Sequence, residues 1–225
     1  MGDAIEEVLP VGVAVALSPM PIIAVVLMLV SARARTNGPL FVLGWLVGLA
    51  LVGAIVLALA GPTESAEGGD PPTWASVVQL VLGAALLALA VRQYRKRPRE
   101  GEEPPVPAWM GALDAFGPGK AFGAGALLSG FNPKNTVLAI SAAATIAQTG
   151  IPGGEQAIAY GVFALVGTIG VAAPVVILFA RGEAATAVLT RLEAWMGHNN
   201  TVIMAVLCLV IGAKLVGQAI TGFAG

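Results

Sequence analysis

The chain has 225 residues, of which 57% are hydrophobic and 11% charged, and its formal net charge is -1. Because soluble domains carry about 25% charged residues, this composition excludes an ordinary soluble protein and indicates one integral membrane domain. The charge pattern contains no basic stripe, so we expect no nucleic-acid partner, and the single cysteine excludes an intramolecular disulfide.

Six apolar segments are long enough to cross the hydrocarbon core of a bilayer as helices, which takes about 20 residues each. They lie at about 5–31, 38–60, 74–94, 119–147, 155–180 and 200–221. The sequence therefore predicts an all-α integral membrane protein with six transmembrane helices and loops on both sides of the membrane.

The first segment is interrupted by the stretch Leu17-Ser18-Pro19-Met20-Pro21. Proline removes a backbone donor and clashes with the carbonyl one turn back, so the helix is expected to break there. A break at membrane depth must be buried in protein or line a wet cavity, and many transporters bind substrate at such breaks. We therefore include Ser18, Pro19 and Pro21 in a candidate substrate-binding site. Ser18 either contacts the substrate or caps the second half-helix.

Basic residues lie on one side of the predicted membrane. All Lys and Arg except Lys134 and Lys214 fall in the first, third and fifth loops, whereas the N-terminus and the second and fourth loops carry carboxylates and no basic residue. Because cytoplasmic loops are enriched in Lys and Arg, we predict that both termini lie outside. Lys214, near the outer end of the sixth segment, either extends to the interface or lies on a substrate pathway.

The longest connection between segments is rich in Arg, Glu and Pro. It predicts a flexible cytoplasmic linker at 95–116, between one three-helix repeat at 1–94 and a second at 117–225, within one membrane domain. The basic cluster at 95–99 either binds anionic lipid headgroups or serves as an ordinary positive-inside anchor.

The fourth segment contains the most unusual stretch of the chain, Ser129-Gly130-Phe131-Asn132-Pro133-Lys134-Asn135. A charge at the bilayer centre costs about 2.5–3.5 kcal/mol, so we expect Lys134 to contact an anionic group or to carry a coupling proton. The alternative is a re-entrant segment that leaves Lys134 near an interface. Asn132 and Asn135 either bind substrate or cap the second half-helix, whose free N–H groups favour anions. With Pro133 they complete the candidate substrate-binding site.

Pro19 and Pro133 occupy corresponding places in the two halves of the chain, and each is followed by an apolar half-helix. Each half has three predicted spans, and an odd number makes the second half enter the membrane from the opposite side. The sequence therefore predicts two inverted-topology repeats in which broken helices 1 and 4 meet near the midplane. The Gly44–Gly48 and Gly119–Gly123 pairs match the GxxxG pattern and are expected to allow close helix packing.

Clusters that carry chemistry are scarce in this sequence. The predicted spans contain no set of His, Cys, Asp and Glu at metal-ligand spacing, and the chain has no evident nucleophile triad or phosphate-binding loop. We therefore expect no catalytic residues, no bound metal, no cofactor and no enzymatic activity.

The stretches 16–22 and 129–135 resemble the Gap-like family, small actinobacterial membrane proteins named for addressing sulfolipid and peptidoglycolipid. This family is grouped with the lysine-exporter superfamily. The resemblance extends over six spans, two triplets and a polar central linker, and Asn132-Pro133-Lys134-Asn135 is its most specific part. It implies a multi-pass protein of the bacterial inner (plasma) membrane that exports a lipid or small solute as a homodimer.

These inferences favour a transporter or export facilitator for a cell-envelope glycolipid or related amphiphile, working by alternating access around a midplane site at the two breaks. One alternative is an exporter of amino acids or small ions, as elsewhere in the superfamily. Another is a non-transporting accessory subunit that docks on a larger lipid-export complex. Membrane lipids are expected partners in each case.

Overall fold

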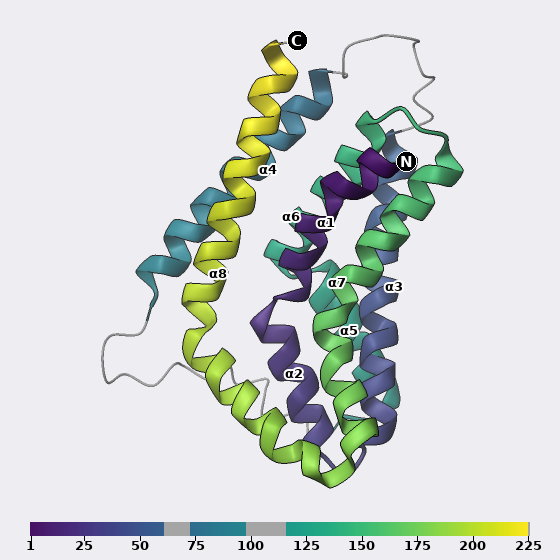
Figure 1. Cartoon of the computed structure of the whole chain (residues 1–225), viewed down its shortest axis with the longest axis vertical. Coiled ribbons are helices and arrows are strands. Elements are labelled where there is room, and N and C mark those ends of the chain that lie inside the picture. The colour runs from purple at the N-terminus through teal and green to yellow at the C-terminus, as the bar shows by residue number, and fades with distance from the viewer. Residues whose placement is uncertain (61–72, 98–115, 225) are drawn as a thin grey trace.

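The computed structural model describes residues 1–60, 73–97 and 116–224. In these ranges every regular element is helical, as Figure 1 shows. The elements are α1 (Gly2–Ala16), α2 (Pro19–Val30), α3 (Ala34–Ala60), α4 (Thr73–Arg95), α5 (Pro118–Gly130), α6 (Pro133–Gln148), α7 (Gly153–Arg181), the short 3₁₀ helix η2 (Gly182–Ala184) and α8 (Ala185–Ala224). The predicted all-α class is confirmed for this part of the chain, while most of the predicted linker at 95–116 lies outside the described residues.

Four of the described helices, α3, α4, α7 and α8, are long and apolar enough to cross a membrane, and α1 with α2 makes a fifth candidate that is bent by 51°. The chain is thus a multi-pass membrane protein with four to five candidate spans among the described residues. The fourth predicted segment forms α5 of 13 residues and α6 of 16 residues, each shorter than a span of about 20 residues. A sixth span requires α5 and α6 to cross together.

The helices α5 and α6 follow one another from one end of the molecule to the other. Just before α5, Phe116 O accepts a hydrogen bond of 2.8 Å from Asn37 Nδ2 in the first turn of α3. At the end of α6, Gln148 Oε1 accepts a hydrogen bond of 3.3 Å from Gln79 Nε2 near the start of α4. Figure 1 shows α3 starting at the lower end and α4 at the upper end, so the two short helices together extend along the length of a span.

The last helix, α8, is 40 residues long and begins at Ala185, well before the predicted start at 200. The stretch from 185 to 199 carries Arg191, Glu193 and His198, so its hydropathy does not predict a span. It is nevertheless rich in the strong helix formers Ala, Leu and Met. In Figure 1 this part of α8 crosses the lower end of the bundle, and the rest runs alongside α4. The predicted boundary was wrong because hydropathy marks the apolar part of a helix rather than its start.

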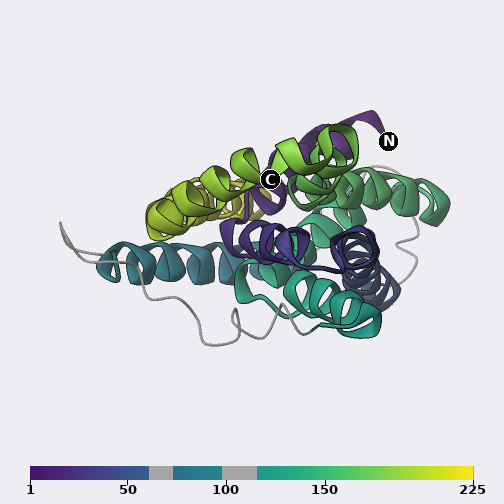
Figure 2. The same cartoon turned by 90° about the horizontal axis from the view of Figure 1, so that it is seen from below.

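The helix α2 is almost wholly enclosed by its neighbours. Its sequence has no polar side chain, and Ala24, Val25, Val26 and Met28 are completely buried. Seen from below, α2 lies between the pair α4–α8 and the group formed by α3, α5 and α7 (Figure 2). A helix that is apolar on all sides is buried in a protein or faces lipid, and here the neighbouring helices cover it.

Glycine allows two close helix contacts. The Gly44–Gly48 pair of α3 lies directly against the backbone of α5, with no room for a Cβ atom. On α7, Gly170 lies equally close to the last carbonyl of α1. The predicted packing role of the Gly44–Gly48 pair is confirmed. The Gly119–Gly123 pair has open space around both residues, so its predicted packing role was wrong.

Hydrogen bonds from buried rings connect α3 and α7 at the centre of the molecule. Trp45 and Phe163 are completely buried, and Trp45 Nε1 donates to Gly167 O at 3.3 Å. In the reverse direction, the Tyr160 hydroxyl donates to Leu49 O at 2.9 Å. Because hydrocarbon offers no hydrogen-bond partner, a buried polar ring atom must find one on a neighbouring helix. These bonds hold α3 and α7 in one register.

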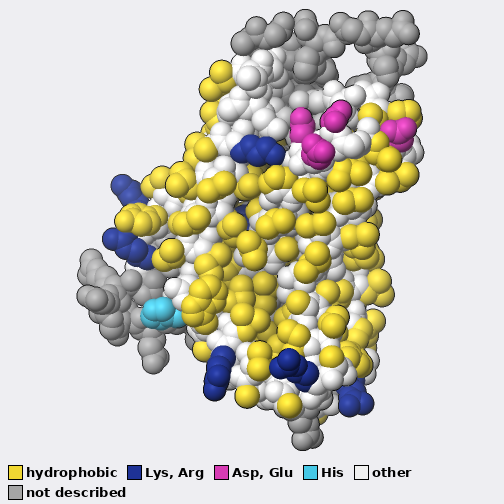
Figure 3. All heavy atoms as spheres, viewed as in Figure 1, with side chains coloured by type: hydrophobic (Ala, Val, Ile, Leu, Met, Phe, Trp, Pro, Cys, Tyr) yellow, Lys and Arg dark blue, Asp and Glu magenta, His cyan; other side chains and the backbone are white. Residues whose placement is uncertain are grey.

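Most charged side chains separate by sign to opposite ends of the molecule. Figure 3 shows the carboxylates gathered at the upper end and most Lys and Arg side chains along the lower and left edges, with an apolar band between them. Lys214 lies at the acidic end, where its Nζ donates to Glu7 O at 2.8 Å. This arrangement is typical of a protein whose two ends face opposite sides of a membrane.

Candidate substrate-binding site

The two helix breaks lie in direct contact. Lys134 Nζ donates to Ser18 Oγ at 2.7 Å, and Ser18 Oγ lies 2.9 Å from Asn135 Oδ1. None of these three side chains is more than 2% exposed. The structure thus brings together three of the predicted site residues, one from the first half of the chain and two from the second.

The ammonium group of Lys134 completes the end of α1. Its Nζ donates to Ala14 O at 2.7 Å. In a continuous helix Ser18 N would donate to this carbonyl, but here Ser18 N donates to Val15 O at 3.2 Å. The last carbonyls of a helix lack backbone donors and form its negative dipole end, so a cation there is favourable. This arrangement offsets part of the cost of burying the charge of a lysine.

The first turn of α6 satisfies carbonyls that α5 leaves open. Asn135 Nδ2 donates to Leu128 O at 3.3 Å, and Thr136 Oγ1 donates to Gly130 O at 2.6 Å. Thr136 was not among the predicted site residues. The signal that points to it is general: Ser and Thr hydroxyls often bond to backbone carbonyls near helix ends. Side chains of the first turn of α6 therefore stabilise the second break by bonding to the last carbonyls of α5.

Asn132 and Ser18 stand at corresponding cap positions but behave differently. Asn132 Oδ1 accepts a hydrogen bond of 3.2 Å from Lys134 N, so the capping interpretation of Asn132 is confirmed. Ser18 precedes α2 and makes no side-chain cap bond; its hydroxyl lies 2.6 Å from Val15 O. The first turn of α2 is rich in proline, which has no N–H group to cap. The capping interpretation of Ser18 was therefore wrong.

The three predicted prolines shape the breaks and offer no donor to a ligand. Pro19 and Pro133 each begin a helix, at the position where the fixed dihedral of proline is favourable and its missing N–H costs nothing. Pro19 and Pro21 are buried, whereas Pro133 is exposed and lines a cavity beside the second break. Their contribution to the site is the backbone geometry of the two breaks.

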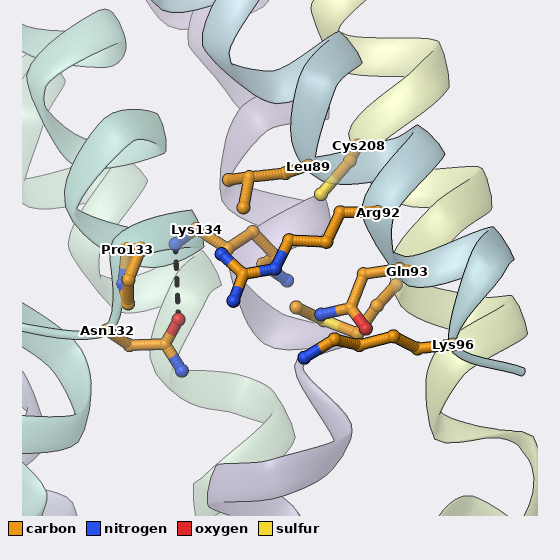
Figure 4. Close-up of a pocket in the computed structure, with 9 residues that line it drawn as sticks. Leu89, Arg92, Gln93, Lys96, Asn132, Pro133, Lys134 and Cys208 are labelled. Carbon is orange, nitrogen blue, oxygen red and sulfur yellow. Dashed lines mark hydrogen bonds between the residues drawn. The ribbon is translucent and has the colours of Figure 1, made fainter.

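The cavity beside the second break has a volume of about 210 Å³ and lies between α4, α6 and α8. Its polar lining comes from Arg92, Gln93 and Lys96 at the end of α4 and from Asn132 and Lys134 at the start of α6. Figure 4 shows the α4 side chains extending toward the start of α6. The described residues of the lining include cations and no carboxylate.

Arg92 and Lys96 were not among the predicted site residues. The sequence interpretation assigned the basic cluster at 95–99 to an anchor or to lipid headgroups, and did not connect it with Lys134. The spacing of Arg92 and Lys96 was the one available signal, because residues four apart lie on the same face of a helix. Whether that face meets the second break depends on how α4 packs against α6, which no local pattern shows.

The chemistry of the cavity suits the binding of hydrogen-bond acceptors. Its polar groups are guanidinium, ammonium and amide, which supply donors in several directions. In the described part of the chain, no group of three or more His, Cys, Asp or Glu side chains is placed to hold a metal ion. The site therefore offers recognition of an anionic or hydroxyl-rich group.

Comparison with models of protein families identifies a match. A family model described as Sap, sulfolipid-1-addressing protein, matches residues 8–221. No curated protein and no solved structure matches the chain. The matched range includes both helix breaks and every residue that lines the cavity.

Proposed function

This chain belongs to the sulfolipid-1-addressing protein family, and we propose that it is a membrane transporter or export facilitator for a cell-envelope glycolipid or related amphiphile. The family description names the addressing of sulfolipid-1. A multi-pass protein with polar groups at membrane depth suits a cargo that has a polar head and apolar chains. We therefore favour an amphiphile as the cargo class.

The hydrogen bond between Ser18 and Lys134 is the observation that carries this proposal. It joins the two breaks through buried side chains at 2.7 Å, next to a cavity with polar walls. In the proposed mechanism this contact closes the path in the described conformation, and its separation opens the midplane site to the other side. Helix ends suit such movement because their dihedrals are not held by a continuous backbone ladder.

We further propose that 1–94 and 117–225 are inverted-topology repeats, with α1–α2 and α5–α6 as broken helices 1 and 4 of six spans. The pattern of packing supports this relation: α3 packs on α5 as α7 packs on α1, and α2 packs on α8 as α6 packs on α4. Gly48 on α3 and Gly170 on α7 make corresponding close contacts with α5 and α1. An in-plane two-fold axis of this kind places paired breaks at the centre of a transporter.

In this proposal the protein lies in the bacterial inner (plasma) membrane, with both termini outside and the basic end in the cytoplasm. The separation of charges in Figure 3 supports this orientation. The proposal also includes membrane lipids as partners, a homodimer as the working unit and docking on a larger lipid-export complex. It assigns no enzymatic step and no cofactor to the chain.

Two other functions each have an observation in their favour. Lys134 already has Ala14 O and Ser18 Oγ as partners, which favours an accessory subunit in which the charge is structural. The cavity of about 210 Å³ is smaller than the roughly 300–1,000 Å³ of pockets for drug-sized ligands, which favours an exporter of amino acids or small ions. The grouping with the lysine-exporter superfamily would agree with the latter.

Transport measured in reconstituted vesicles at matched protein levels separates these functions. Lys134→Met keeps the length of the side chain and removes its charge, so we expect movement of a fluorescent sulfated glycolipid to fall about tenfold or more while membrane insertion survives. Lys214→Met, the control, is expected to have a milder effect. Absence of lipid movement by the wild type contradicts the proposal and favours the accessory subunit. Equal transport by wild type and Lys134→Met shows instead that the charge of Lys134 is structural. Movement of amino acids but not of lipid favours the small-solute exporter.

A further inference from the structure

Among the described residues, the lining of the cavity beside the second break carries positive charge without a counter-charge. Arg92, Lys96 and Lys134 line it, and the partners of Lys134 Nζ are a carbonyl and a hydroxyl, which carry no net charge. Within the described ranges, the one ion pair joins the Met1 amino group to Glu155 at 3.8 Å, at the acidic end of the molecule. A cluster of cations in a hollow concentrates anions.

We propose that this cavity binds a sulfate or phosphate oxyanion, and that Arg92 and Lys96 are its principal contacts. The guanidinium of Arg92 presents paired donors that match two oxygens of one oxyanion, and Lys96 adds a compact charge one turn along the chain. Figure 4 shows both side chains extending toward Asn132. Because Asn132 uses Oδ1 to cap α6, its Nδ2 remains to donate to the ligand.

The size and surroundings of the cavity favour an oxyanion carried by a lipid headgroup over a free anion. A volume of about 210 Å³ holds a sulfate or phosphate ester but not a whole glycolipid. Beside the break, Phe131 is 80% exposed and Leu127 is 59% exposed, on a protein whose exposed apolar surface faces lipid. An amphiphile can thus place its charged group among the cations and leave its chains in the bilayer. The site rests on the proposed function and identifies the group of the cargo that is recognised.

Binding in this cavity also acts on the contact between the two breaks. An oxyanion that reaches Lys134 competes with Ala14 O and Ser18 Oγ for the N–H donors of the ammonium group. Hydrogen bonds between charged partners are about twice as strong as neutral ones, so the anion has the advantage. Occupation of the cavity therefore weakens the contact that holds the two breaks together.

The test measures lipid binding to the full chain in nanodiscs by native mass spectrometry. The probes are a sulfated galactosylceramide and its unsulfated parent at equal mole fraction, which differ only in the oxyanion. Arg92→Gln/Lys96→Gln removes two cations from the cavity. Arg35→Gln/Arg191→Gln removes two exposed basic residues that do not line it. Both double variants change the net charge equally, so diffuse surface attraction affects both alike.

We expect the wild type to retain the sulfated lipid about tenfold or more over its parent, the cavity variant to lose most of this preference, and the surface variant to keep it. Lys96→Gln alone is expected to weaken the preference about fivefold, and it provides the test if the double variant does not fold. Equal loss in the cavity and surface variants overturns the site.

Inorganic sulfate distinguishes a free anion from a headgroup. In detergent, a rise of the thermal unfolding midpoint with added sulfate, seen in the wild type and absent from the cavity variant, supports the oxyanion site with a free anion as its ligand. A lipid preference without this rise supports it with a headgroup as the ligand. Absence of both effects overturns it.

The oxyanion site and the proposed function fail in different ways. If the wild type binds the sulfated lipid in the cavity but moves no lipid across vesicles, the site stands and the transport function is wrong. If the cavity variant binds no sulfated lipid yet moves lipid at the wild-type rate, the transport function stands and the site is wrong.

Discussion

Lys134 Nζ lies 2.7 Å from Ala14 O, so a side chain from the start of α6 completes the end of α1. Lys134 is the second residue of its own helix, where the positive dipole end disfavours a cation. By extending across to α1, the side chain places its ammonium at a negative dipole end instead. Since Lys134 also lines the cavity, one residue connects the cavity with the contact between the two breaks.

We expect Ser18→Ala to lower the free energy of unfolding by about 1 kcal/mol, because it removes an interhelical partner of Lys134 and of Asn135. Ser31→Ala is the matched control. Its hydroxyl also bonds to a carbonyl three residues earlier, Met28 O at 2.7 Å, but the structure records no bond from it to another helix. Unfolding in detergent compares the two. An equal loss in both variants would assign the effect to the local helix end.

We expect Thr136→Val to destabilise the protein by about 1–3 kcal/mol, because it leaves a carbonyl of the second break without its donor. The hydroxyl bonds to Gly130 O at 2.6 Å and lies 2.9 Å from Asn132 O. Thr136→Ser keeps the hydroxyl and should retain most of the stability. Thermal unfolding midpoints measure the difference, and similar midpoints for the two variants would contradict this role of the hydroxyl.

The close packing of α1 and α7 predicts that Gly170→Ala costs about 1–3 kcal/mol of stability, because a Cβ has no room beside Ala16 O. Gly161 lies on the same helix with open space around it, so Gly161→Ala should be neutral or slightly stabilising. A denaturant titration of both variants measures the contrast. If both alanines change stability equally, α1 and α7 can move apart without loss of stability. The contact between Gly170 and Ala16 O then does not constrain the first break.

The charge separation predicts which end of the molecule is outside. In a Cys208→Ser background, a membrane-impermeant thiol reagent applied to intact cells should label Gly154→Cys and reach Gly119→Cys only after permeabilisation. Both glycines have open space where the new side chain would lie. The reverse pattern of labelling would show that the basic end lies outside.

The two breaks were predictable because proline and asparagine act on their immediate neighbours. Pro133 has no N–H and clashes with the carbonyl one turn back, which favours the start of a new helix at this position, and Asn132 finds its capping partner two residues along the chain, at Lys134 N. Ser18 was misassigned because one of its partners, Lys134, lies 116 positions away. A local sequence pattern predicts that a hydroxyl bonds to the nearest backbone donor. In the folded protein, helix packing places the buried cation of Lys134 within hydrogen-bond distance of the Ser18 hydroxyl.

By itself, the sequence determined that the chain is helical, that it is membrane-spanning, where two helices break and that basic residues gather on one side. These properties follow from hydropathy, dihedral restriction and charge, each of which is present in a short stretch of chain. Only the tertiary structure decided that Lys134 bonds to the end of α1, and that Arg92 and Lys96 share a cavity with it. Those relationships depend on which helix faces meet. A side chain extends several ångströms and contacts residues of whichever helix packs beside it. The separation of two residues along the chain does not show whether they are in contact.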